Sequence, residues 1–377
     1  MRVYLDNAAT TPMSPEVIEV MTDVMKNNFG NPSSIHSYGR DAKAVIENAR
    51  RTVSKLINAE PKEIIFTSGG TEADNMALFS AINDLGVKHI ISSTIEHHAV
   101  EHTYKKIQKN YKVKISLVKL DKKGNVDLDD LENLLSNSKE KTLVSLMHAN
   151  NEIGTLLPLK KVSELCKKYN AYFHSDTVQT MAHYPFDLGS FQIDFLTCSA
   201  HKFHGPKGIG FLYVNKNLKI NPIIEGGSQE RGLRAGTENL IGIVGLAKAL
   251  ELANTDINDH IEHVKSLKYD MLQQLKSKIK DIEVNGEEIF EKSLYTVLSI
   301  KFPQFSKQEV LLFMLDLEGI ACSGGSACSS GANAGSHVIK GIGGDTTKAT
   351  IRFSFSRYTT KKDIDFAVEK VVKIFNS

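Results

Sequence analysis

Short apolar runs alternate with segments of helical periodicity through the first two thirds of the chain, and this alternation restricts the fold more than any other feature. Runs such as EIIFT (63–67) and HIISS (89–93) have the length and composition of buried strands. Helical segments such as 41–57 and 71–84 separate them. Strands that alternate with helices predict an α/β fold with a mainly parallel sheet. Further strands are expected at 114–120, 142–148, 171–175, 194–199 and 208–214, and further helices at 98–110, 127–136, 159–170 and 240–254.

The pattern changes near residue 255, and with 377 residues the chain is long enough for two domains. We predict a large domain over 15–255 and a smaller α+β domain made of 1–14 and 256–377. Residues 323–336 are Ser, Gly and Ala except for Cys328 and Asn333. Such a stretch buries little, so we expect a mobile loop, and the lone cysteine favours function over a passive linker. In the smaller domain we expect helices at 257–280, 307–318 and 361–375 and strands at 294–301 and 349–356.

Charge and cysteine content exclude several classes of protein. Lys and Arg number 46 against 44 Asp and Glu, a net charge of +2, which gives no electrostatic reason to expect nucleic-acid or membrane binding. No apolar run approaches the roughly 18 residues of a membrane span, and the N-terminal segment lacks the apolar core of a secretory signal. Four cysteines are too few for a disulfide framework. We therefore expect a cytoplasmic protein.

Lys202 and Asp176 are the residues from which chemistry can be argued. Each follows an apolar strand, and the carboxyl ends of strands are where α/β folds bind ligands. A desolvated lysine amine forms Schiff bases, and a carboxylate can keep a pyridinium nitrogen protonated, so this pair is what pyridoxal phosphate requires. A lone lysine is more often a surface residue, and Asp176 could equally cap a helix. The two residues together favour the cofactor.

A phosphate site is expected where the strand EIIFT meets the next helix. Backbone N–H groups of Gly70 and Thr71 would face an anion at the helix N-terminus. Ser199 and His201, which flank Lys202, could donate to the same phosphate. A Gly-Gly turn is weak evidence alone, since tight turns need glycine anyway.

The remaining histidines predict no metal site. His98 and His102 have the i, i+4 spacing of a metal pair, but no nearby ligand set joins them in the sequence, so a solvated helix face is the better interpretation. His260 and His263 lie on a polar helix and are expected to be exposed.

Ten ordered segments resemble cysteine desulfurases of the NifS/IscS type, which belong to the class V aminotransferase family. They are YLDNAATTP (4–12), FGNPSSIHSYGR (29–40), FTSGGTEADN (66–75), EHHAVE (96–101), HANNEIG (148–154), HSDTVQ (174–179), SAHKFHGPKGIG (199–210), RAGTEN (234–239), GGSACSSG (324–331) and IRFSFSRYT (351–359). The resemblance covers nearly the whole chain. It implies the type I fold of pyridoxal-phosphate-dependent transferases, with a seven-stranded sheet in the large domain.

The resemblance also implies a role for each matching residue. Lys202 holds the cofactor covalently, Asp176 pairs with its pyridine nitrogen, and His97 stacks on the ring and moves protons. Arg352 binds the substrate carboxylate, a role that competes with that of a surface charge on a strand, and Asn151 also contacts the substrate. Thr237 reaches the phosphate of the neighbouring subunit, which implies a homodimer. The other implied cofactor contacts are Gln179 and Asn151 near the ring hydroxyl, with Gly70, Thr71, Ser199 and His201 at the phosphate.

Cys328 is implied as the residue that carries the sulfur. The implied reaction removes sulfur from L-cysteine, releases L-alanine and leaves a persulfide on Cys328, which passes to an iron–sulfur scaffold protein or a tRNA-thiolation enzyme. Cys166 lies among apolar helix positions and Cys198 ends a strand, so both are expected in the core, and Cys322 is the one serious rival.

Two departures from the family pattern and two alternatives remain. Residues 332–335 are shorter than the usual segment and lack its proline, and His98 stands where many relatives carry lysine. A selenocysteine lyase or an aminotransferase on the same scaffold would keep Lys202 and Asp176 without needing Cys328. An assembly scaffold with a vestigial site is a non-enzymatic alternative, which the intact Lys202, Asp176 and Gln179 set disfavours.

Overall fold

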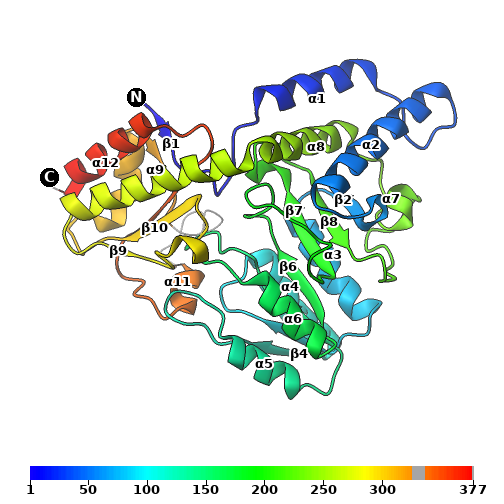
Figure 1. Ribbon diagram of the computed structural model, residues 1–377, viewed down its shortest axis with the longest axis horizontal. Helices are drawn as coiled ribbons and strands as arrows, with labels where there is room; N and C mark the ends of the chain where they lie inside the picture. The colour runs from blue at the N-terminus through cyan, green and yellow to red at the C-terminus, as the bar shows by residue number, and fades with distance from the viewer. Residues whose placement is uncertain (325–335, 376–377) are drawn as a thin grey trace.

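The computed structural model describes residues 1–324 and 336–375, and its largest element is a seven-stranded sheet (Figure 1). The strand order is β2-β8-β7-β6-β5-β3-β4. β8 runs antiparallel to both of its neighbours, and the other adjacent pairs are parallel. The predicted mainly parallel α/β sheet is therefore confirmed. Its strands are β2 (Ile64–Thr67), β3 (His89–Ser92), β4 (Lys114–Leu117), β5 (Thr142–Ser145), β6 (Tyr172–Asp176), β7 (Phe195–Ser199) and β8 (Gly210–Val214).

Helices cover both faces of this sheet because its central strands are apolar on both sides. Phe195 packs into the core shared with α3 and α4, whereas its neighbour Leu196 packs into the core shared with α2 and α8. The predicted helices are present as α2 (Ser37–Leu56), α3 (Gly70–Asn83), α4 (His98–Tyr111), α5 (Leu128–Ser136), α6 (Leu159–Lys168) and α8 (Leu240–Thr255). The sequence analysis missed α1 (Pro15–Asn27), although proline at its first position is a typical helix start.

A second core lies around a three-stranded antiparallel sheet with the order β12-β10-β9. Ile351, Phe353 and Phe355 pack into it beneath α9 and α12. Both chain ends lie beside this part of the molecule (Figure 1), where β1 pairs with β11 in parallel. The elements are β1 (Val3–Tyr4), α9 (Ile257–Lys278), β9 (Glu283–Val284), β10 (Val297–Lys301), α10 (Leu311–Leu317), β11 (Ile320–Ala321), α11 (His337–Gly341), β12 (Thr350–Ser354) and α12 (Lys361–Phe375).

Three expectations for this region were wrong in detail. The strand expected from 294 begins at Val297, and the first part of the helix expected over 307–318 is a 3₁₀ turn, Gln308–Val310, that leads into α10. His260 is buried rather than exposed, because its ring packs edge-on against Tyr295 with 5.7 Å between ring centroids. His263 is exposed as expected. Within the described residues, no helix combines the length and the apolar character that crossing a bilayer requires.

A buried ion pair fixes the segment that precedes the RAGTEN motif. Glu230 accepts hydrogen bonds from both terminal nitrogens of Arg50, at 2.7 and 2.9 Å, and from the backbone N–H of Phe66 on β2. Both charged side chains are only 3% exposed. Next to it, Arg234 pairs with Glu72 in the first turn of α3 at 2.8 Å. Residues 230–234 are therefore held against the start of α3.

Replacing Glu230 with alanine is expected to destabilise the protein by about 3 kcal/mol or more, because the change leaves the Arg50 charge buried without this partner. The free energy of unfolding, measured by urea denaturation, checks this. Arg231→Ala is the matched control, since its ion pair with Glu47 is partly exposed, and removing such a pair costs about 1 kcal/mol or less. Equal losses in the two variants would contradict the expectation.

Candidate active site

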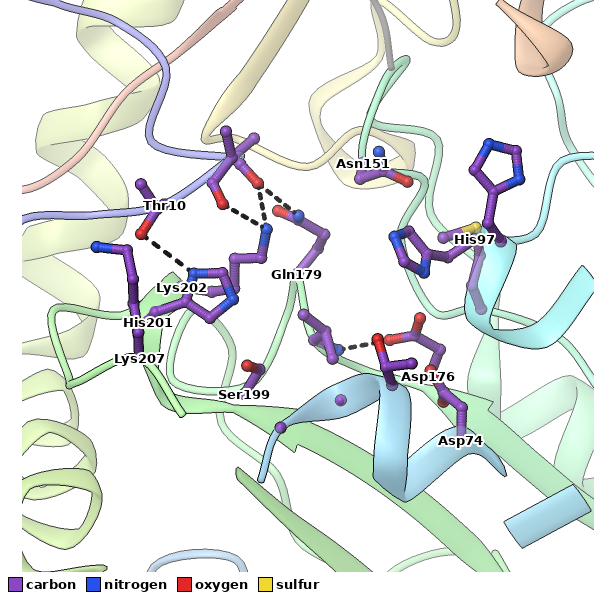
Figure 2. Close-up of a pocket in the computed structure, with 18 of the residues that line it drawn as sticks. Thr10, Asp74, His97, Asn151, Asp176, Gln179, Ser199, His201, Lys202 and Lys207 are labelled. Carbon is purple, nitrogen blue, oxygen red and sulfur yellow. Dashed lines mark hydrogen bonds between the residues drawn. The ribbon is translucent and has the colours of Figure 1, made fainter. Parts of the chain in front are cut away.

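Five strands of the large sheet lead into segments that line one cavity of about 490 Å³ at the edge where these strands end. β3, β5, β6 and β7 are parallel, and β2 has the same direction because it is antiparallel to β8. The segments that leave these strands therefore converge, as expected for ligand sites of α/β sheets. Figure 2 shows side chains from opposite sides pointing into this pocket, with Lys202 and His201 facing His97 and Asn151 across it.

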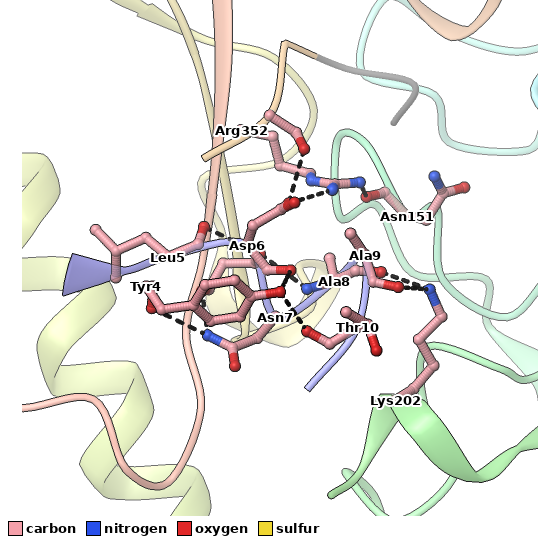
Figure 3. A network of polar contacts seen from close by, with 12 residues as sticks. Tyr4, Leu5, Asp6, Asn7, Ala8, Ala9, Thr10, Asn151, Lys202 and Arg352 are labelled. Atoms are coloured by element: carbon pink, nitrogen blue, oxygen red, sulfur yellow. Dashed lines mark hydrogen bonds and ion pairs between the residues drawn. The ribbon is translucent and has the colours of Figure 1, made fainter. Parts of the chain in front are cut away.

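Lys202 lies at the end of a 3₁₀ turn, Ala200–Lys202, directly after β7. Its amine points into the pocket and donates hydrogen bonds to the backbone oxygens of Ala8 and Ala9, at 2.7 and 2.9 Å (Figures 2 and 3). A lysine held by two carbonyls inside a cavity is not a solvated surface residue. The surface interpretation is therefore wrong, and the amine is placed to react with a ligand in the pocket.

Asp176 ends β6 and lies beside a second carboxyl group that the sequence analysis missed. One oxygen of Asp176 accepts from the backbone N–H of Val178 at 2.9 Å, so it stabilises a turn rather than capping a helix. Asp74, from α3, is fully buried, and burial together with the charge of Asp176 raises its pKa well above the usual value. Burial also lowers the pKa of His174, which lies 3.4 Å from Asp74, to about 3.

His97 caps the N-terminus of α4, and this contact fixes its tautomer. Its Nδ1 accepts from the backbone N–H of Ala99 at 3.1 Å, so the proton of a neutral ring lies on Nε2. Burial is the largest of the causes that lower the pKa of His97. The Gln179 amide donates to the Ala8 oxygen at 3.0 Å and so lies next to the Lys202 amine. His97, Gln179 and Asn151 all line the pocket.

The turn between β2 and α3 forms another wall of the pocket. Gly69 has a φ of +154°, a conformation that is essentially restricted to glycine. A Cβ on Gly70 would lie 2.6 Å from Val178, so a side chain at this position would clash within the pocket wall. Ser199 and His201 face this turn, and His201 bonds to Thr10 at 3.1 Å. Free backbone N–H groups at the start of α3 make this end of the pocket suited to an anion.

Arg352 is 1% exposed, so the alternative of a surface strand charge is wrong. Its terminal nitrogens bind a carboxylate oxygen of Asp6 and the backbone oxygen of Asn151, each at 2.8 Å (Figure 3). Asp6 also accepts from Ser323 at 2.8 Å. Each terminal nitrogen carries a second N–H, so the guanidinium is oriented and can still bind an anion in the pocket that it lines.

The structure brings most of the predicted site residues together. The pocket is lined by Gly70, Thr71, His97, Asn151, Asp176, Gln179, Ser199, His201, Lys202 and Arg352. Thr237 is exposed and lines a smaller neighbouring cavity beside Ser68, and Cys328 lies outside the described residues. The sequence analysis gave no role to residues 6–10, which supply the partners of Lys202 and Arg352, although YLDNAATTP was among the ten segments that could have indicated one.

Comparison with known proteins agrees with this geometry. The family model described as aminotransferase class-V matches residues 3–366. The chain belongs to the class V aminotransferase family. It is 44% identical to the cysteine desulfurase IscS of Dictyoglomus turgidum over 99% of this chain and 94% of that protein. A solved structure named NIFS-like protein is 36% identical with a TM-score of 0.91, and each chain is covered completely.

The solved structures that resemble the chain include one whose name gives bound cysteine. This structure, named SspA in complex with cysteine, is 28% identical with a TM-score of 0.82, and covers 95% of this chain and all of that one. The resemblance to NifS/IscS-type cysteine desulfurases and the expected type I fold are therefore confirmed.

The pocket residues fit pyridoxal phosphate, the cofactor that this family implies. The glycine turn at α3 leaves room where a Cβ would clash, and it offers N–H groups to a phosphate. Asp176 supplies the carboxylate for a pyridine nitrogen, and the Lys202 amine points into the same cavity. Three features that the cofactor needs, an anion cradle, a carboxylate and an amine, thus surround one space.

Proposed function

We propose that the chain is a pyridoxal-phosphate-dependent cysteine desulfurase, which converts L-cysteine to L-alanine and carries the removed sulfur as a persulfide on Cys328. The observation that carries the proposal is the convergence of the Lys202 amine, the Asp176 carboxylate and the Arg352 guanidinium on one cavity. Relatives named cysteine desulfurase, 40 to 44% identical over 99% of the chain, support the same reaction.

Each residue of the pocket has a role in holding the cofactor. Lys202 would hold it covalently, Asp176 would keep its pyridine nitrogen protonated, and His97 would contact it with the proton of the neutral imidazole on Nε2. The bound cofactor withdraws electrons from the substrate α-carbon. Gln179 and Asn151 would bind near the ring hydroxyl, and Gly70, Thr71, Ser199 and His201 would hold the phosphate.

The substrate carboxylate binds to Arg352 in this proposal. Asp6 and the Asn151 oxygen already orient the guanidinium, so little side-chain freedom is lost when the substrate arrives. The amine of Lys202 then takes the α-proton. A Cys328 thiolate attacks the substrate sulfur, an S–S bond forms as the Cβ–S bond breaks, and the electron pair stays with the carbon that becomes the alanine methyl group. Two protons complete alanine, and Cys328 is left as a persulfide.

Arg352→Lys is expected to lower kcat/KM for L-cysteine by about 10- to 100-fold, because lysine keeps the charge but loses the two-pronged hydrogen bonding to a carboxylate. Steady-state alanine production measures the effect, with most of it in KM. Arg357→Lys is the matched control, since Arg357 lies three residues after the end of the same strand and outside the pocket. An unchanged KM in Arg352→Lys, with intact cofactor absorbance, would assign carboxylate binding to another residue.

A homodimer belongs to the same proposal, with Thr237 reaching the phosphate bound by the neighbouring subunit. Thr237 is exposed here. Large apolar side chains on α1 and α2 and between them are also exposed, up to 75% for Phe29 and 92% for Ile35. Ile18, Met25 and Tyr38 extend this surface, which lies far from α12 in Figure 1. An exposed apolar surface of this kind typically marks a protein interface. Sedimentation velocity of the loaded enzyme would show a single chain mass if this part is wrong.

Domain organisation, location and sulfur acceptor are further parts of the proposal. The division into a large domain (15–255) and a small domain (1–14 and 256–377) is supported by two separate cores. A cytoplasmic location is supported by the free thiols of the three described cysteines. The acceptor of the persulfide is a protein of iron–sulfur assembly or tRNA thiolation.

The test is an absorbance spectrum of the purified protein before and after addition of L-cysteine, with alanine and sulfide measured as products. We expect the visible band of a lysine-bound pyridoxal group, a change on addition of L-cysteine, and alanine equal to sulfide in the presence of a reductant. A colourless protein that gains no activity with added pyridoxal phosphate would overturn the proposal. Transfer of the amino group to an added 2-oxo acid, with 3-mercaptopyruvate as the product and no sulfide, would favour an aminotransferase.

A further inference from the structure

Two histidines and a glutamate from distant parts of the chain meet at the wall of the pocket. His98 and Glu101 lie in the first turn of α4, and His337 is the first residue of α11. Nδ1 of His98 lies 3.1 Å from a carboxylate oxygen of Glu101. One potential ligand atom from each of the three residues lies within 4.8 Å of the other two. The sequence analysis expected no ligand set around His98, and the structure corrects this.

The orientation of His337 is suited to binding a cation through Nδ1. Its Nε2 lies 3.0 Å from the backbone oxygen of Glu96, and because a carbonyl only accepts hydrogen bonds, Nε2 carries the proton. In the neutral ring the lone pair is then on Nδ1. Histidines that bind metals almost always donate their other ring N–H in this way, often to a backbone carbonyl. His337 therefore has the environment that a metal-binding histidine has.

The stacked neighbour His102 is not part of this group. The rings of His98 and His102 stack with 4.8 Å between centroids, whereas His98 and His337 are 4.4 Å apart. Lys105 also contacts Glu101. It contacts one carboxylate oxygen, and His98 contacts the other. The i, i+4 spacing thus indicated His98 correctly but paired it with His102 instead of His337. The partner comes from a position 239 residues later, which no spacing rule could indicate.

We propose that His98, Glu101 and His337 bind one divalent cation of the Zn²⁺ class, with a fourth coordination position open toward the pocket. Two imidazoles and one carboxylate are a donor set that Zn²⁺ uses when it keeps an open position. Nitrogen ligands disfavour Mg²⁺ and Ca²⁺, which prefer oxygen. Ligands of tetrahedral Zn²⁺ lie about 3.3 Å apart, so side-chain rotations of the two rings suffice to close the present separations.

The location indicates what the open position can bind. His98 and His337 line the same cavity as His97 and Lys202. A soft anion inside that cavity, above all a thiolate, would complete the coordination of the cation. A bound cation would also join α4 to α11, which pack into separate hydrophobic clusters, and would raise thermal stability because it binds only the folded chain. This inference concerns metal binding alone and does not depend on the proposed reaction.

The experiment is a calorimetric titration of the untagged, cofactor-loaded, full-length protein with Zn²⁺, repeated in a Cys328→Ser background so that this thiol cannot bind the metal. We expect one saturable Zn²⁺ site per chain, no comparable site for Mg²⁺, and a Zn²⁺-dependent rise in Tm. Glu101→Gln and His337→Asn should each weaken Zn²⁺ binding by about 100-fold or more. Loss of a residue that only positions a metal ligand already weakens binding by up to about 100-fold, and loss of a ligand itself should cost at least as much. His102→Asn is the matched control and should retain it.

Several results would overturn the proposal. The first is the absence of saturable Zn²⁺ binding. The second is an equal affinity for Zn²⁺ in the unchanged protein and in His337→Asn. The third is a loss of Zn²⁺ binding in His102→Asn while the other variants retain it. Circular dichroism of each variant reports its folding, and His98→Asn replaces any variant that does not fold. Because the readout is heat and Tm on addition of the metal, a failure here leaves the desulfurase proposal unaffected, and the reverse also holds.

Discussion

Lys202→Ala is expected to lower alanine production from L-cysteine by about 10³-fold or more, because the change removes the group that both binds the cofactor covalently and takes the α-proton. The Ala8 and Ala9 oxygens that hold the amine would remain in place, so the fold should persist. Activity alone cannot separate these two losses. Borohydride treatment followed by peptide mass analysis reports the covalent bond directly, and the mass of the reduced cofactor should be found on the Lys202 peptide of the unchanged protein.

Lys207→Ala is the matched control for this substitution. Lys207 also lines the pocket but is exposed and follows Lys202 by five positions. The borohydride label should persist in Lys207→Ala and disappear in Lys202→Ala. If the label in Lys202→Ala moved to another lysine and sulfur release continued, the assignment of Lys202 would be wrong.

Cys328→Ser is expected to abolish sulfur release, with a loss of at least about 10²-fold, while the cofactor spectrum stays unchanged. The argument rests on the other cysteines, since Cys328 lies outside the described residues. Cys166 and Cys198 are buried in the core as predicted, and burial raises the pKa of both thiols far above the usual range. Burial, with Asp6 nearby, raises the pKa of Cys322 to about 12. Thiols of this kind are not nucleophiles at neutral pH.

Cys322→Ser provides the comparison for Cys328→Ser, because Cys322 was the serious rival in the sequence. Sulfide release in the presence of a reductant, and the mass of the persulfide on each cysteine-containing peptide, are the measurements. Cys322→Ser should retain both within a few-fold. A persulfide on Cys322, or normal turnover in Cys328→Ser, would contradict the proposed carrier.

Local patterns predicted the sheet and the residues that follow its strands. Lys202 and Asp176 could be found because parallel strands place their carboxyl ends at the same edge of a sheet. Residues that directly follow two such strands in the sequence are therefore expected to lie close together in space. The choice between a reactive lysine and a surface lysine needed the structure, since only the carbonyls of residues 8 and 9 show that the amine is held in a cavity. Helix α1 and the buried position of His260 depended on packing that periodicity did not reveal.

Contacts between distant residues were beyond prediction from one sequence. The Asp6–Arg352 pair joins positions 346 residues apart, and nothing in the local composition of either segment indicates the other. Asp74 resembles an ordinary polar residue of an N-terminal helical turn, and its raised pKa follows from burial that only the assembled sheet creates. The meeting of His98 with His337 has the same origin.

The segment from Val3 to Thr10 has a consequence for how the protein is made. It pairs with β11 and with Ser354 of β12, and it supplies two carbonyls that accept from the Lys202 amine and a carboxylate that binds Arg352. Residues 3–10 therefore take their final place only after β12 has been synthesised. A nascent chain can complete the large sheet early, but it acquires a finished catalytic centre only when synthesis has passed β12.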